Sequence, residues 1–249
     1  MSNLFGRLSL KFSRLAARKL ARRWLPLDRQ PGVVSFSFDD VAASACRVGA
    51  DILERHGGRA TFFICGGLTG QEEQGHRCHD VADLQRLQDK GHEIGCHTFS
   101  HLNCVQTPPA QLEADWVRNQ DFFRQHQLAL QGFAFPFGAY AYGAKRTASR
   151  RFAYARITGG GSQHGRADLN ALRAQALYAA STPVSQIQAL IAETRASGGW
   201  LIIYSHEVTP EPGPWGTTPE QLETCVKAAA EAGCHLLPVN EAIAFFRQR

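Results

Sequence analysis

The stretch "FSFDD" (36–40) ends an apolar run and places two carboxylates, Asp39 and Asp40, where a buried strand is expected to stop. The residues that lead into the pair are β-branched or aromatic: Val33, Val34, Phe36 and Phe38. Adjacent carboxylates repel each other and are difficult to desolvate, so a neutralising partner is expected beside them. A metal ion is one such partner.

Short apolar runs alternate with amphipathic segments from this point onward. We predict strands near 33–38, 60–65, 92–96, 131–136, 154–158, 173–178, 200–205 and 235–238. We predict helices near 42–56, 80–90, 110–126, 184–197 and 218–232. This alternation indicates parallel strands joined by crossover helices, which predicts an α/β fold and allows a barrel. Catalytic groups in such folds gather at the carboxyl ends of the strands.

The segment "GHEIGCHTFSH" (91–101) carries two histidines four residues apart, His97 and His101, just after a strand-like run. On a helical turn, two imidazoles at this spacing share one face and reach one ion. The pair alone is weak evidence in a chain with ten histidines. Together with the Asp-Asp strand end, it favours a site of two histidines and one carboxylate, which leaves metal positions open for water and substrate.

Two further strand ends carry candidate site residues. His206 ends the most apolar run, "WLIIYSHEV" (200–208), and is placed to act as a general acid at the same edge. In "FAFPFGAY" (133–140), Pro136 and Gly138 interrupt an aromatic strand, so the backbone N–H of Phe137 is a candidate oxyanion donor. Each segment also has a plain structural explanation, as a strand-closing histidine and as a turn with core aromatics.

The order and spacing of these motifs resemble the polysaccharide deacetylases of the NodB-homology type, carbohydrate esterase family 4, over about residues 33–245. "SFDD", "HTFSH" and "FAFPFG" resemble the first three motifs of that family, and the Trp and His at 200–206 resemble the last two. The resemblance implies an irregular, TIM-like (β/α)7 barrel of the NodB, or glycoside hydrolase–deacetylase, type. It also implies one divalent metal ion, usually Zn²⁺.

The resemblance assigns roles to individual residues. Asp40, His97 and His101 would be the metal ligands, Asp39 the general base and His206 the general acid. The oxyanion and substrate contacts would come from Phe137, Pro136 and Trp200. In the implied reaction, a water activated by the metal attacks the amide carbonyl of an N-acetylated sugar in a polysaccharide or lipid-linked glycan precursor.

Two positions depart from the family pattern. Ala134 stands where many relatives carry an arginine, and "ASGGW" (196–200) lacks the aspartate that often accompanies the fourth motif. Those groups normally tether the base and the acid, so the substrate class is left open. The segment "GHRCHD" (75–80) could bind metal, but we predict a solvated turn because it has no partner cluster.

Charge is concentrated at the N-terminus. Residues 1–30 hold eight Lys or Arg side chains against the single acid Asp28, and the remainder is nearly balanced at 19 basic and 21 acidic residues. A near-neutral body argues against a nucleic-acid partner. Seven scattered cysteines without CxxC spacing indicate a reducing compartment. With no signal-peptide core recognised in the first thirty residues, we expect a cytoplasmic location.

The N-terminal residues 1–30 are predicted to form a basic amphipathic helix ahead of a catalytic domain at 31–249. In residues 4–27, apolar side chains recur at helical spacing beside a basic stripe: Leu8, Phe12, Leu15, Leu20 and Trp24, with Arg7, Lys11, Arg14, Arg18 and Arg22. Such a helix either packs on the barrel or lies on the anionic inner face of a membrane.

Three functions are compatible with these motifs. A metal-dependent sugar N-deacetylase is favoured. A related amide hydrolase, such as a deformylase of a lipid-linked aminosugar or an allantoinase-like enzyme, would share the metal site. A catalytically silent module that binds carbohydrate or membrane would keep the metal without hydrolysis.

Overall fold

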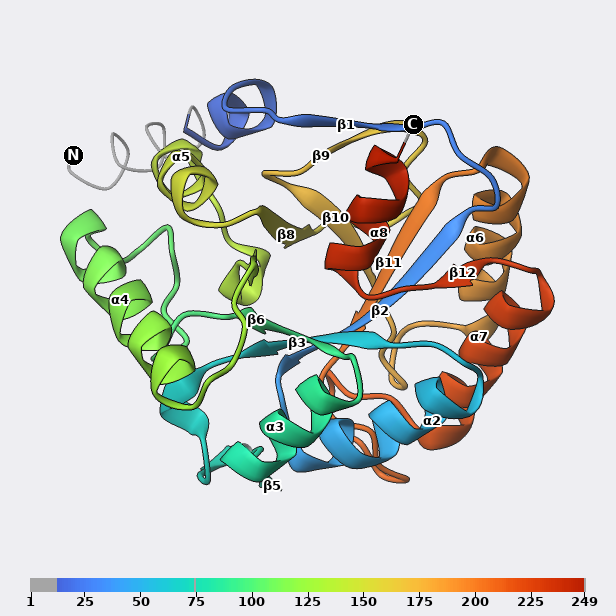
Figure 1. Ribbon diagram of the computed structural model, residues 1–249, viewed down its shortest axis with the longest axis horizontal. Helices are drawn as coiled ribbons and strands as arrows, with labels where there is room; N and C mark the ends of the chain where they lie inside the picture. Colours follow the sequence, from blue (N-terminus) through green and yellow to red (C-terminus); the bar gives the residue numbers. More distant parts are fainter. Residues whose placement is uncertain (1–12, 74, 249) are drawn as a thin grey trace.

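A ring of seven parallel strands forms the centre of the protein in this computed structural model, which describes residues 13–73 and 75–248 (Figure 1). The ring runs in the order β2 (Val33–Asp40), β3 (Ala60–Ile64), β6 (Glu93–Cys96), β7 (Gly132–Ala134), β8 (Tyr154–Thr158), β10 (Leu172–Ala176) and β11 (Trp200–Ser205). It closes because β11 pairs with β2, which places Trp200 beside Val33 and Ser205 beside Phe38. The short strand β12 (His235–Leu236) joins the start of β2. The predicted (β/α)7 barrel is confirmed.

Helices cover the outside of the ring (Figure 1). They are α2 (Ala50–Arg55), which continues a π-helical turn at Ala45–Gly49, α3 (Val81–Asp89), α4 (Pro109–Gln125), α5 (Tyr142–Arg151), α6 (Val184–Ser197), α7 (Pro219–Glu231) and α8 (Val239–Arg247). Local sequence signals start several of them. Asp80 caps α3 by accepting a hydrogen bond from the backbone N–H of Asp83, and Thr218 caps α7 just before Pro219.

The alternation of side chains along β2 explains the paired aspartates. Val34, Phe36 and Phe38 pack in the layer between the barrel and its helices. Positions between them face the barrel interior, where Asp39 meets the buried Arg156. Asp40 is the last residue of the strand, and its left-handed backbone (φ 57°) changes the course of the chain there. The two carboxylates therefore lie in different environments, Asp39 inside the barrel and Asp40 at the end of the strand.

The predicted strands of the barrel all form, with ends shifted by a few residues, whereas helices α5 and α8 were not predicted. Two short strand pairs were also not predicted: the outer hairpin of β4 (Glu72–Glu73) and β5 (His76–Arg77), and the pair of β1 (Trp24–Leu27) with β9 (Gly165–Asp168). These strands are too short for periodicity to detect.

The N-terminal helix is shorter than predicted. Residues 13–19 are helical, whereas Trp24–Leu27 forms strand β1, so helical spacing does not continue to Trp24. Leu8 and Phe12 lie outside the described residues. Within the described ranges, no helix combines the length and apolarity needed to cross a membrane.

Candidate metal centre and active site

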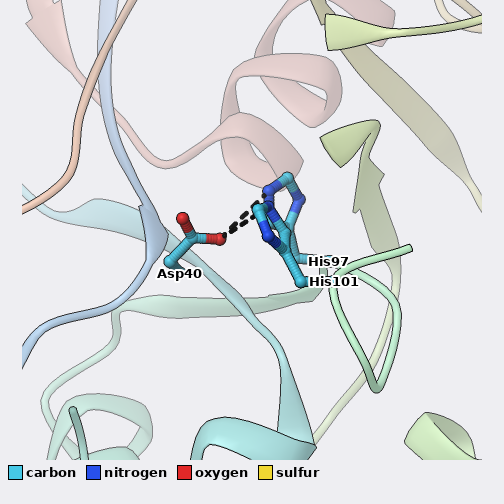
Figure 2. Close-up of side chains that lie close together, drawn as sticks. All are labelled: Asp40, His97 and His101. Carbon is cyan, nitrogen blue, oxygen red and sulfur yellow. Dashed lines mark ion pairs between the residues drawn. The ribbon is translucent and has the colours of Figure 1, made fainter. Parts of the chain in front are cut away.

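Three predicted metal ligands meet at the carboxyl ends of the strands (Figure 2). Asp40 Oδ1 lies 3.5 Å from His97 Nε2 and 3.1 Å from His101 Nε2. One candidate donor atom from each residue lies within 4.8 Å of the other two. Donors bound at about 2.0–2.1 Å around a tetrahedral ion would lie roughly 3.3 Å apart, so this spacing fits a small divalent cation.

Hydrogen bonding and burial prepare the donors for a cation. His97 Nδ1 lies 2.8 Å from the carbonyl oxygen of Ala134, which can only accept, so the proton sits on Nδ1 and Nε2 faces Asp40. Burial lowers the pKa of His97 to about 3 and also lowers the pKa of His101, which keeps both imidazoles neutral. Burial raises the pKa of Asp40 to about 7, against the opposing effect of His206. A bound cation would offset the free-energy cost of burying the ionised Asp40 carboxylate.

The backbone at this site is strained. Seven described non-glycine residues have positive φ, and five of them belong to the site: Asp40, Val41, Thr98, His101 and Phe137. Such conformations cost about 1–3 kcal/mol each and persist where the surroundings enforce them. Thr98 and His101 are also the reason that the predicted helical turn is wrong. The two histidines converge from a loop that the buried Asp115 of α4 holds through the backbone N–H groups of Phe99 and Ser100.

Asp39 forms a buried ion pair with Arg156 of β8. The Arg156 Nη2 group donates to Asp39 Oδ2, while Asp39 Oδ1 is buried without a hydrogen-bond partner. Burial would raise the pKa of Asp39, but Arg156, together with His97 and His206, outweighs it and holds the pKa below its ordinary value. One oxygen of an ionised carboxylate therefore stays available to accept a proton.

Arg156 was not identified by the sequence analysis, although it occupies an informative place. Strands β7 and β8 pair so that Ala134 lies directly beside Arg156. The expected arginine is therefore missing at 134, but its neighbour on the next strand supplies a guanidinium to Asp39. An arginine in the middle of the apolar run "YARIT" (154–158) was the available signal, because a buried arginine needs an anionic partner.

His206 is nearest to the other carboxylate oxygen of Asp40. Its Nε2 is 3.8 Å from Asp40 Oδ2, and its Nδ1 is 3.0 Å from the carbonyl oxygen of Trp215. That carbonyl orients the imidazole. His206 therefore lies at the site, and a backbone carbonyl is the hydrogen-bond partner that orients it.

Trp200 is not at the site, so the prediction that it contacts substrate is wrong. It is fully buried at the start of β11, its Nε1 donates to Ser35 Oγ, and it packs on Phe246. Since the strand runs from Trp200 to Ser205, the indole lies at the end opposite His206. Trp215, which is 49% exposed, is the tryptophan that borders the site.

A small cavity of about 40 Å³ lies among these groups. Its walls include Asp39, Asp40, Glu73, His76, Cys78, His206, Glu207 and Trp215. The segment 75–80 was predicted to be a solvated turn, and this is wrong. His79 is fully buried, and its two nitrogens contact the Val41 carbonyl and the Thr69 hydroxyl. These contacts pack the segment against the loop that follows β2.

The third motif forms a tight turn at the rim. Pro136 is buried and begins the 3₁₀ turn Pro136–Gly138. Phe137 is 65% exposed, and its ring lies 4.5 Å from the ring of His101. An exposed aromatic ring therefore lies beside the candidate metal ligands.

Three candidate metal ligands, an ion-paired aspartate and a histidine therefore gather at one end of a (β/α)7 barrel. The sequence profile of the polysaccharide deacetylase family matches residues 27–155, and the chain belongs to this family.

Individual relatives agree with this assignment. Over 126 residues the chain is 33% identical to the chitin deacetylase of Colletotrichum lindemuthianum, and the matched stretch covers 47% of each protein. The chain thus spans about half the length of this curated relative. The structure of a mutant of the peptidoglycan deacetylase PdaC from Bacillus subtilis superimposes with a TM-score of 0.56 at 15% identity, over 88% of this chain and 92% of that one.

The same fold also occurs in a protein described as a pseudoenzyme. A CE4 family pseudoenzyme from Bacillus anthracis superimposes with a TM-score of 0.57 at 14% identity, over 86% of this chain and 66% of that one. Activity in this fold therefore depends on the side chains at the site.

Proposed function

We propose that this protein hydrolyses the amide bond of an N-acetylated sugar and releases acetate, using one divalent metal ion, with Zn²⁺ favoured by the two-histidine, one-carboxylate donor set. The observation that carries the proposal is the convergence of Asp40, His97 and His101 beside an ion-paired Asp39. When bound, the cation would polarise a water and the acyl carbonyl.

The remaining steps use groups of the chain. Asp39 Oδ1, buried and without a partner, accepts the proton of the attacking water. The backbone N–H of Phe137 is the proposed donor to the oxyanion, and the Phe137 ring contacts the sugar. His206 carries a proton to the leaving amine, so that the products are acetate and an aminosugar.

Replacing His206 by alanine is expected to lower turnover by about 10²–10⁴-fold, the usual range for a general acid. Metal content and thermal stability should stay near those of the parent protein, because His206 is partly exposed and lies 3.8 Å from Asp40. Trp200→Phe is the matched control, since the buried indole should affect stability and leave turnover little changed. Full activity in His206→Ala would assign the acid to another group.

The experiment that tests the function is metal analysis of the purified protein combined with an acyl-release screen. The screen covers N-acetylated oligosaccharides, nucleotide sugars and lipid-linked sugars, and includes N-formylated aminosugars. Acetate release that a chelator abolishes and added Zn²⁺ restores supports the proposal. Tight metal retention with no hydrolysis of any substrate would indicate a silent binding module, and formate release alone would indicate a deformylase.

We also propose that the N-terminal segment brings the protein to the anionic inner face of a membrane. Leu15 and Leu20 are 51% and 50% exposed, beside exposed arginines of the same segment. Apolar side chains and basic residues that are presented together are the features of an in-plane membrane helix. Such an attachment would favour a lipid-linked sugar as substrate.

The double variant Leu15→Ser/Leu20→Ser is expected to lose binding to phosphatidylglycerol vesicles by roughly 100-fold in partition coefficient, since each leucine contributes about 1.5–3 kcal/mol on burial. Co-sedimentation at low salt measures it. The matched control is Val48→Ser/Val117→Ser, two exposed valines elsewhere. Deleting residues 1–27 would be a poor test, because it removes the buried Leu25 and strand β1. If the intact protein does not co-sediment with the vesicles, the proposed membrane attachment is refuted.

A further inference from the structure

A cavity of about 740 Å³ opens on the outside of the barrel, next to the N-terminal helix. The connection from β8 to β10 contains strand β9 where a covering helix would be expected, and the helix at 13–19 and β1 run along this side instead (Figure 1). Six cationic side chains line the cavity: Arg14, Arg18, Arg22, Lys145, Arg166 and Arg173. Among the described lining residues, Asp168 has the only carboxylate.

The charge of this lining is largely uncompensated. Asp168 is already paired with the buried Lys145 at 2.6 Å, and Lys145 also donates to the carbonyl oxygens of Ala17 and Leu20, which fixes the helix to the body. Within residues 13–73 and 75–248, none of the five arginines has a carboxylate within 4.0 Å. The residues outside those ranges contain no acidic side chain. A bound anion would offset the mutual repulsion of these cationic side chains.

Two of the guanidinium groups are held in place by an indole. The Arg166 guanidinium lies 4.2 Å from the ring centre of Trp24, and that of Arg22 lies 5.1 Å from it. Arg22 also donates from Nε to the carbonyl oxygen of Arg18 at 2.8 Å. Oriented, planar donors suit bidentate recognition of phosphate oxygens.

The cavity adjoins the proposed active site. Phe137 and Gly138 line it, and the ring of Phe137 contacts that of His101. One residue thus separates the cationic lining from the metal ligands. A ligand that occupies both would present its sugar to Asp40, His97 and His101 and its anionic end to the arginines.

We propose that this cavity binds the phosphate or diphosphate ester of the substrate, so that the N-acetylated sugar is recognised as a sugar phosphate. The inference rests on the proposed function and narrows its substrate class. A volume of about 740 Å³ accommodates a diphosphate together with part of its carrier, whether that carrier is a nucleoside or a lipid.

The test measures pyrophosphate binding to the full-length protein by isothermal titration calorimetry. Arg18→Gln/Arg166→Gln is expected to raise the dissociation constant about tenfold or more, the effect of losing charge-assisted hydrogen bonds. Arg146→Gln/Arg150→Gln, which removes the same charge from exposed positions of α5 outside the cavity, should change it less than about twofold. His101→Ala should keep the affinity, because the anion does not sit on the metal ligands.

A kinetic arm and a vesicle arm identify the source of the phosphate. UDP-N-acetylglucosamine should inhibit hydrolysis of an uncharged N-acetylchitooligosaccharide about tenfold less well in the Arg18/Arg166 variant than in the parent protein. Unaltered pyrophosphate affinity in that variant, or equal loss in the Arg146/Arg150 control, overturns the proposal. In the vesicle arm, Arg166→Gln alone leaves the N-terminal segment unchanged. Loss of binding to phosphatidylglycerol vesicles in this variant, with pyrophosphate affinity intact, would make the cavity a lipid-headgroup site and also overturns the proposal. Failure of the proposed function appears separately, as an absence of hydrolysis by the parent protein.

Discussion

Asp40→Ala, His97→Ala and His101→Ala should each lose stoichiometric metal and, with it, all measurable hydrolysis. Three donors within 4.8 Å of one another form the site, and a three-ligand site cannot keep its affinity when one is removed. Metal content by mass spectrometry and acetate release measure the two effects. Circular dichroism confirms that each variant is folded.

Asp39→Asn is the matched control, because it changes the neighbouring carboxylate and leaves the three donors in place. It should retain the metal and lower turnover by about 10²–10⁴-fold, since the proton acceptor is lost. The opposite pattern, with an empty site in Asp39→Asn and a filled one in Asp40→Asn, would exchange the roles of the two carboxylates.

Arg156→Met is expected to destabilise the protein by about 3–5 kcal/mol, because it leaves the Asp39 carboxylate buried without its partner. Turnover should fall as well, since Asp39, the proposed base, loses the group that holds it ionised and oriented. Denaturant unfolding and acetate release measure the two effects. The double variant Arg156→Met/Asp39→Asn should recover much of the stability and none of the activity.

A positioning role for Arg156 is distinguished from a general packing role by moving the charge. Arg156→Lys should recover part of the activity. Ala134→Arg in an Arg156→Ala background should also recover part of it, because positions 134 and 156 are directly paired and point to the same side of the barrel wall. If the relocated arginine restores stability without any turnover, Arg156 packs the core and does not position the base.

The fold was largely predictable because it depends on local patterns. Each barrel strand is a short apolar run, and several crossover helices begin at a capping residue such as Asp80 or Thr218. The strand-end positions of Asp40, His97 and His206 were also visible, since parallel strands bring their carboxyl ends to one edge. The shift from helix to strand at Trp24 was not, because β1 forms only through its pairing with β9.

What the sequence by itself determined was the alternation that makes an α/β barrel and the residue types that can bind a metal at the ends of its strands. The tertiary structure decided which groups meet. It buried Trp200 at the far end of its strand and brought Trp215 to His206. It also paired Arg156 with Asp39 across strands that are 117 residues apart in sequence. Periodicity reports which face of an element is apolar, whereas such contacts depend on register and barrel closure, which arise only when distant strands pair.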